Sequence, residues 1–89
     1  MVKIDWELYS WILRGSQRRK ILVVLNKPKI PTEIKTETKL SIAHVSKILK
    51  LFEAQGIVEC LTPNVRMGKI YALTKKGETI RKQVIKGSG

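Results

Sequence analysis

The longest regular pattern of apolar and polar residues runs through residues 40–56, LSIAHVSKILKLFEAQG. Its apolar residues recur at intervals of three and four and so share one side of a helix: Val45, Ile48, Leu49 and Phe52. Ser41 precedes the run, where a side-chain oxygen can accept a free N–H of the first turn, and Gly56 follows it, where a left-handed stop is cheapest. The pattern predicts one capped helix over residues 41–55, about four turns long.

The other side of this helix carries small, hydroxyl and cationic side chains, here called the outer strip: Ala43, Ser46, Lys47 and Lys50. Helical spacing places these residues together, and such side chains allow close approach to a nucleic-acid groove. Two interpretations stay open at this point. The helix reads DNA, or it is a solvated amphipathic helix that binds nothing.

The chain begins with a second kind of pattern. Residues 4–13, IDWELYSWIL, predict a helix with Asp5 as its cap and Gly15 as its stop. Its apolar residues surround nearly the whole helix: Trp6, Leu8, Tyr9, Trp11, Ile12 and Leu13. A small domain cannot cover all of them, so either a second copy of the chain covers the remainder or the helix closes an undersized core.

A second helix is predicted from Ser16, as its cap, through Asn26. Arg18, Arg19 and Lys20 lie in its first turns, at the end where the helix dipole favours anions. A bound phosphate explains this placement, and so does simple tolerance of the charge.

A turn and a short helix lead into the pattern at residues 40–56. Pro28 and Pro31 restrict the residues before them, so residues 26–31 form a turn in which only Lys29 and Ile30 run extended. A helix then starts at Pro31 and ends by about Thr38. Two helices joined by so few residues, the second longer and basic on its outer side, predict a helix-turn-helix.

The rest of the chain predicts a hairpin and a closing helix. Residues 57–62 and 69–74 are rich in β-branched and apolar side chains and are separated by a turn over residues 63–68. Arg66 and Lys69 near the tip can reach a phosphate or a minor groove, or the tip is merely solvated. A helix follows Thr74, and residues 87–89 are expected to fray.

Charge changes the picture more than size does. A chain of 89 residues suits one small domain, and 18 Lys and Arg against 7 Asp and Glu give a net charge of +11. Residues 1–15 carry no net charge, whereas the rest of the chain is basic. Such an excess attracts polyanions, and the first helix is expected to face away from them.

The sequence lacks the residues that several kinds of function need. Cys60 has no disulfide partner and only His44 beside it as a soft ligand, so we expect no metal and no cofactor, with Cys60 a small core residue. The sequence shows no paired carboxylates, no Ser-His-Asp set and no phosphate loop, so we do not expect an enzyme. Apolar runs are too short to span a bilayer and no signal peptide opens the chain, so a soluble, cytoplasmic protein without membrane contact is expected.

Two segments carry a family resemblance. Residues 40–58, LSIAHVSKILKLFEAQGIV, resemble the reading segment of MarR-like and ArsR-like bacterial and archaeal regulators in Ser41, the Val45-Ser46 pair, Leu49, Phe52 and Gly56-Ile57-Val58. Residues 66–80, RMGKIYALTKKGETI, resemble the wing and closing helix of that family. Together the resemblance covers residues 17–84. It implies a mainly α fold with a small β-hairpin, a winged helix-turn-helix with a three-helix core, a wing and extra N- and C-terminal helices.

The resemblance also implies a set of DNA contacts. Base-facing positions would be Ile42, Ala43, His44, Ser46 and Lys47; Lys50 would face phosphate and Arg66 would lie on the wing. Two departures stand out, because Lys35 occupies a place where the family packs Ala and Lys39 one where the family turns on Gly. A Lys at positive φ costs about 1 kcal/mol, so we expect a differently formed turn or a tilted helix.

The leading hypothesis is a sequence-specific regulator of transcription that binds double-stranded DNA. Residues 41–55 would enter the major groove, and the wing, residues 62–70, would touch backbone or minor groove, with Arg18, Arg19, Lys50, Arg66 and Lys69 as phosphate or wing contacts. Residues 1–15 would form a homodimer through Trp6, Tyr9, Trp11 and Leu13, residues 16–86 the DNA-binding domain and residues 87–89 a tail. The alternatives are a winged-helix module that binds a protein through the first helix, and RNA or nonspecific duplex binding.

Overall fold

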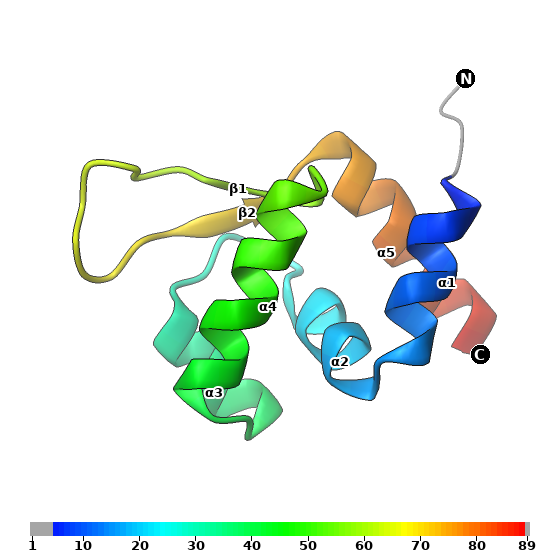
Figure 1. Ribbon diagram of the computed structural model, residues 1–89, viewed down its shortest axis with the longest axis horizontal. Helices are drawn as coiled ribbons and strands as arrows, with labels where there is room; N and C mark the ends of the chain where they lie inside the picture. The colour runs from blue at the N-terminus through cyan, green and yellow to red at the C-terminus, as the bar shows by residue number, and fades with distance from the viewer. Residues whose placement is uncertain (1–4, 89) are drawn as a thin grey trace.

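The computed structural model describes residues 5–88, and Figure 1 shows its elements in order. They are α1 (Trp6–Arg14), α2 (Ser16–Val24), α3 (Pro31–Thr38), α4 (Ile42–Ala54), β1 (Val58–Cys60), β2 (Tyr71–Leu73) and α5 (Lys75–Ser88). The mainly α fold class with a two-stranded antiparallel hairpin is therefore confirmed. Nowhere in residues 5–88 does a helix combine the length and the apolar character needed to cross a membrane.

A single core receives side chains from the five helices and both strands. Its largest fully buried members include Phe52, Ile12, Ile21, Leu22, Leu25, Ile34, Leu49, Ile57 and Ile80. The four residues that the helical period placed on the inner side of α4 are all buried, as predicted. Leu8 and Ile12 of α1 belong to the same core cluster, so the first helix packs as part of the domain. This core anchors α4 from behind and leaves its other side open.

The boundary between the first two helices differs from the prediction. Asp5 caps α1 as expected, its Oδ1 accepting the Leu8 N–H at 3.1 Å, while Ile4, the predicted first residue, lies outside the described residues. Gly15 ends α1 in an extended conformation and also precedes α2, so Ser16 is already helical and makes no cap hydrogen bond. The prediction of Ser16 as the cap was wrong because one residue alone connects the two helices.

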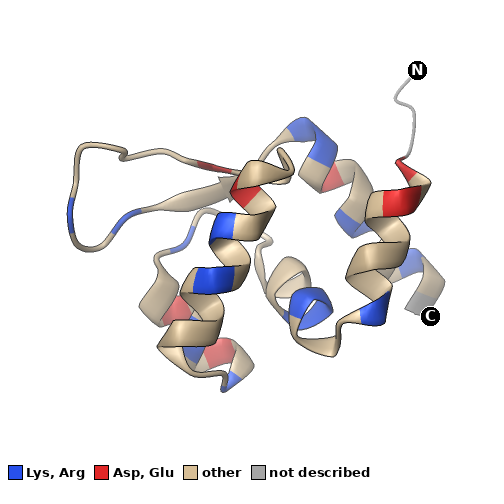
Figure 2. Cartoon of the chain, viewed as in Figure 1, with Lys and Arg blue, Asp and Glu red and all other residues tan. Residues whose placement is uncertain are grey.

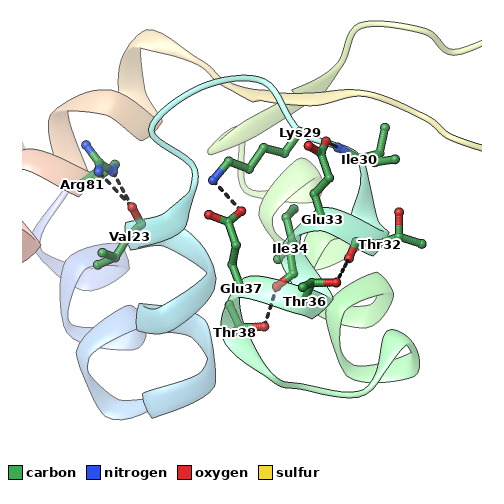
Figure 3. A network of polar contacts seen from close by, with 10 residues as sticks. All are labelled: Val23, Lys29, Ile30, Thr32, Glu33, Ile34, Thr36, Glu37, Thr38 and Arg81. Atoms are coloured by element: carbon green, nitrogen blue, oxygen red, sulfur yellow. Dashed lines mark hydrogen bonds and ion pairs between the residues drawn. The ribbon is translucent and has the colours of Figure 1, made fainter.

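Helix α2 ends at Val24, two residues before the predicted end at Asn26. The Arg81 side chain of α5 donates to the Val23 carbonyl from Nε at 3.0 Å and from Nη2 at 2.8 Å. Figure 3 shows this contact between helices distant in sequence. A tertiary partner thus satisfies a carbonyl that the end of the helix leaves free.

The turn between α3 and α4 keeps a tight left-handed form despite its lysine. Lys39 has φ of 60° and donates its N–H to the Lys35 carbonyl at 2.8 Å. Thr38 is buried and its hydroxyl donates to the Ile34 carbonyl at 2.7 Å. The expectation of a differently formed turn is therefore wrong: Lys39 adopts the conformation that favours glycine, and Lys35 stays exposed. The alternative, a tilted helix, stays a prediction.

Strands β1 and β2 pair with Val58 opposite Leu73 and Cys60 opposite Tyr71. Both strands are shorter than the predicted runs. Beyond the ladder, the Leu61 N–H donates to the Ile70 carbonyl at 2.8 Å, and the Ile70 N–H donates to the Thr62 hydroxyl instead of to a backbone carbonyl. Cys60 is half-buried against the core. Lys29 forms an isolated antiparallel bridge to the other side of Tyr71, so one of the two residues predicted to run extended before α3 pairs with β2.

Helix α5 begins at a compact junction. The Thr74 hydroxyl donates to the Gly56 carbonyl at 2.6 Å and its oxygen accepts the Gly77 N–H at 3.0 Å. Gly56, with φ of 74°, makes the predicted left-handed stop after α4. Residues 87 and 88 continue the helix and Gly89 lies outside the described residues, so the fraying of 87–89 stays a prediction.

Candidate nucleic-acid interface

The outer strip of α4 is open to a partner. Ala43, Lys47 and Lys50 are exposed, and Ser46 is half-buried between them. Two further positions implied to face bases, Ile42 and His44, are exposed at the start of the same helix. Figure 2 shows the basic positions of α4 on the side that faces the viewer, beside the hairpin. The structure therefore brings the predicted base-facing residues onto one accessible surface.

Ser41 and His44 form a small hydrogen-bonded unit at the beginning of α4. The Ser41 Oγ accepts the backbone N–H of His44 at 3.2 Å, which is the predicted cap. The same Oγ lies 3.0 Å from the His44 Nδ1, within hydrogen-bond distance. The contact engages one ring nitrogen and leaves Nε2 without a partner within this pair, so the imidazole is held at the end of the helix that would enter a groove.

The wing projects away from the helical body on the side of α4, as Figure 1 shows. Arg66 is exposed on it and Lys69 is half-buried near its base. Met67 between them is 86% exposed, the largest exposed fraction among the large hydrophobic side chains that the structure describes. The wing thus carries a cation and an unpacked apolar side chain next to the surface of α4, which is a combination that minor-groove contacts use.

The basic residues at the start of α2 do not act as one group. Arg18 lies over the Trp11 ring, 4.5 Å from its centroid, and donates from Nη1 to the Trp11 carbonyl at 2.6 Å. This guanidinium joins α1 to α2, so Arg18 is a poor phosphate contact. Arg19 and Lys20 are exposed and remain available to an anion.

The aromatic residues of α1 are divided in the same way. Trp11 packs edge-on against Phe52 with ring centroids 5.9 Å apart, so it serves the core. Tyr9 meets the Trp6 ring at 5.7 Å and lies against Gly87, where an added Cβ would sit 2.8 Å from its hydroxyl. Trp6 is 64% exposed and Leu13 is 38% exposed. Of the four predicted dimer residues, these two alone offer substantial open surface.

Sequence reasoning missed Lys29. Its side chain is 4% exposed, and its Nζ donates to Glu37 Oε2 at 2.6 Å, as Figure 3 shows. A lysine between two prolines resembles a solvated loop residue, so no signal in the sequence indicated its burial. The pair ties the segment before α3 to α3 itself.

One phenol of the core has a shifted pKa. Burial raises the pKa of the Tyr71 phenol, and the neighbouring Cys60 and Glu53 raise it further. In residues 5–88, no three His, Cys, Asp or Glu side chains gather where they could hold a metal ion. What the surface of α4 and the wing offers is shape, positive charge and hydrogen-bond donors.

A basic helix-turn-helix followed by a hairpin defines the winged helix-turn-helix class, and comparison with solved structures agrees. A mutant of MarR from E. coli, complexed with operator DNA, matches with 24% identity and a TM-score of 0.72, over 93% of this chain and 61% of that one. A MarR family transcriptional regulator from Silicibacter pomeroyi matches with 14% identity and a TM-score of 0.74, over 92% and 62%. The chain thus spans about three fifths of these MarR chains. The predicted resemblance to MarR is confirmed at the level of the fold.

A second kind of neighbour matches over all of this chain and most of its own. TubR, a protein of type III plasmid segregation, aligns with 18% identity and a TM-score of 0.79, over 100% of this chain and 92% of that one. These neighbours are transcription regulators and a plasmid segregation protein. No protein-family model matches the sequence, and no curated protein matches it significantly.

Proposed function

We propose that this protein is a sequence-specific regulator of transcription that binds double-stranded DNA. The observation that carries the proposal is the outer strip of α4, exposed beside a wing that bears Arg66. An α-helix of this kind fits the major groove, and a wing next to it reaches the flanking backbone or minor groove. A MarR neighbour was solved in complex with operator DNA, which supports DNA binding by this fold.

Affinity and sequence choice would come from different side chains. A net charge of +11 releases counterions from the phosphate backbone, with Arg19, Lys50 and Lys69 close to the duplex. Ile42 and Ala43 suit a thymine methyl group, and Lys47 suits the O6 and N7 acceptors of guanine. His44 would offer an N–H or accept one at a base edge, held by Ser41.

A homodimer through α1 completes the proposal. Trp6 and Leu13 are exposed on α1, and Ile85 is 42% exposed on α5, the helix that packs beside α1. Trp6 and Leu13 are seven residues apart, two turns of the helix, and so lie on the same side of α1. An exposed tryptophan and leucine on one helix side suit a self-complementary patch. Two copies would present two α4 helices to half-sites about one duplex turn apart.

A gel-shift titration with mixed genomic fragments tests the DNA claim. A few fragments should stay bound as salt rises after bulk binding has been lost. Lys47→Ala should weaken these fragments selectively by about tenfold, whereas Lys86→Ala, an equal loss of charge on α5, should lower binding to all fragments slightly. Uniform loss of all fragments at low salt would contradict the proposal and favour a protein-binding module.

Sedimentation tests the dimer separately. The parent chain should have twice the monomer mass, and the double variant Trp6→Ala with Leu13→Ala should have the mass of a monomer. Lys20→Ala, on the exposed side of α2, should leave the mass unchanged. A monomeric parent would remove the dimer and leave the DNA claim standing.

The match to TubR, over all of this chain and 92% of that one, supports a second candidate, a DNA-binding role in plasmid segregation. The two roles differ in what the bound DNA does. A fragment retained in the gel shift is placed beside a reporter promoter and, separately, on an unstable plasmid. Changed reporter expression supports the regulator, and improved plasmid retention supports the segregation role.

A further inference from the structure

Lys29 is an unexpected place for a charge. Lys29 is the one charged residue that is buried among the described residues. Its side chain is 4% exposed, whereas that of its partner Glu37 is 45% exposed. Lysine is almost never buried so completely unless it is paired, because its ammonium group loses its hydration. The outer strip and the wing do not contain this pair, so DNA contact does not explain it.

The backbone of Lys29 holds the base of the wing. Its N–H donates to the Tyr71 carbonyl at 2.9 Å, and its carbonyl accepts the Tyr71 N–H at 2.8 Å. On its other side Tyr71 pairs with Cys60 of β1. Lys29 is therefore the outer neighbour of the strand from which the wing emerges.

The side chain of the same residue holds the helix-turn-helix. Its Nζ reaches Glu37 at 2.6 Å, in the last turn of α3, as Figure 3 shows. The tight turn at Lys39 then joins α3 to α4. One residue thus connects the wing, by its backbone, to the unit that carries the outer strip, by its side chain.

We propose that Lys29 is a positioning residue that sets the wing relative to α4, so that both contact one duplex together. The inference rests on the proposed DNA binding and adds a coupling between its two contacts. Rigid placement matters because a mobile wing must be ordered when it binds, and that loss of freedom lowers affinity. A purely stabilising role makes a different prediction: loss of the ion pair would then change the stability of the domain but not the effect of a wing substitution on DNA affinity. Glu37 is 45% exposed and stays hydrated without its partner, so no buried charge is left unpaired.

A double-mutant cycle with the wing separates these roles. In the parent chain, Arg66→Ala should weaken binding to a retained fragment by about tenfold. In the Lys29→Met background the same change should weaken it by less than about threefold, because the backbone pair with Tyr71 remains but the base of the wing is no longer tied to α3, and through α3 to α4. Lys47→Ala should keep its full effect in both backgrounds, since α4 still docks.

Lys27→Met is the matched control. Lys27 is exposed in the same turn, so the change removes one positive charge without touching the ion pair. Arg66→Ala should then keep its tenfold effect. Thermal melting of each variant reports its folding, and if Lys29→Met does not fold, Glu37→Gln, altered at the half-exposed partner, is taken through the same cycle.

The outcomes are distinct. A reduced Arg66 effect with Lys29→Met, and a full one with Lys27→Met, supports the positioning role. If the two substitutions Lys29→Met and Arg66→Ala lower DNA affinity by independent factors that multiply, the positioning role is overturned, even where specific binding is intact. A parent chain that retains no fragment contradicts the proposed function, and with it this inference.

Discussion

The guanidinium of Arg18 lies over the indole of Trp11, 4.5 Å from the ring centroid, and hydrogen-bonds to the carbonyl of that same residue. Two residues that suggested separate binding surfaces thus bind each other. The contact fixes α1 on α2, so the proposed DNA and dimer contacts fall to Arg19 and Trp6, which are exposed. Its consequence for stability can be measured.

Arg18→Ala should lower the free energy of unfolding by about 1–2 kcal/mol, because it removes a cation–π contact and a charged hydrogen bond. Arg19→Ala removes the same charge from an exposed position and should change that free energy by less than about 0.5 kcal/mol. Urea denaturation measures both. For DNA affinity the order should be reversed, with the larger loss in Arg19→Ala.

Gly77→Ala should destabilise the domain by more than about 2 kcal/mol. A Cβ at this position would collide with the backbone carbonyl of Ile57, which accepts hydrogen bonds from the N–H and the hydroxyl of Thr74 and cannot move without disturbing that junction. Gly68→Ala is the control, because its φ of 70° strains alanine but nothing lies near the added carbon. That variant should lose only about 1 kcal/mol by thermal unfolding.

Lys39→Gly should be more stable than Lys39→Ala by about 1 kcal/mol. Both remove the charge, but only glycine relieves the left-handed conformation at φ of 60°. Chemical denaturation of the two variants side by side isolates the strain. Equal stability would mean that the turn relaxes in solution to a conformation that suits any residue.

Stability should fall as the pH rises above about 10 through Tyr71. Its pKa is raised in the folded protein, chiefly by burial, above the ordinary value of 10.0. The folded state therefore binds the phenolic proton more tightly than the unfolded state, and this contribution is present below the unfolded pKa and is lost as pH rises through the folded one. Tyr71→Phe should flatten that part of the profile in urea titrations between about pH 9 and 11.

The helix-turn-helix could be predicted because its signals are local. Ser41 as a cap, the apolar period of α4 and the stop at Gly56 act within one or two turns, so neighbouring residues suffice to define them. The hairpin followed from two β-branched runs with a turn between them. The ends of α2 were misplaced because one depends on the single-residue link at Gly15 and the other on Arg81, 58 residues from Val23.

The candidate site was predictable only in part for the same reason. Helical spacing identified the outer strip, whose exposure requires only that the opposite side be buried. The sequence could not predict which basic side chains are paired and which are exposed. Arg18 and Arg19 are adjacent in sequence, yet Arg18 contacts Trp11 and Arg19 faces solvent.

The sequence alone thus predicted that this protein is a basic winged helix-turn-helix in which one side of α4 is exposed. It could do so because composition, caps and periodicity are properties of short segments. Tertiary structure decided which charges are free, which aromatic side chains stay exposed and that Lys29 joins the wing to α3. These depend on contacts between segments far apart in the chain, where burial and pairing are set by the whole core.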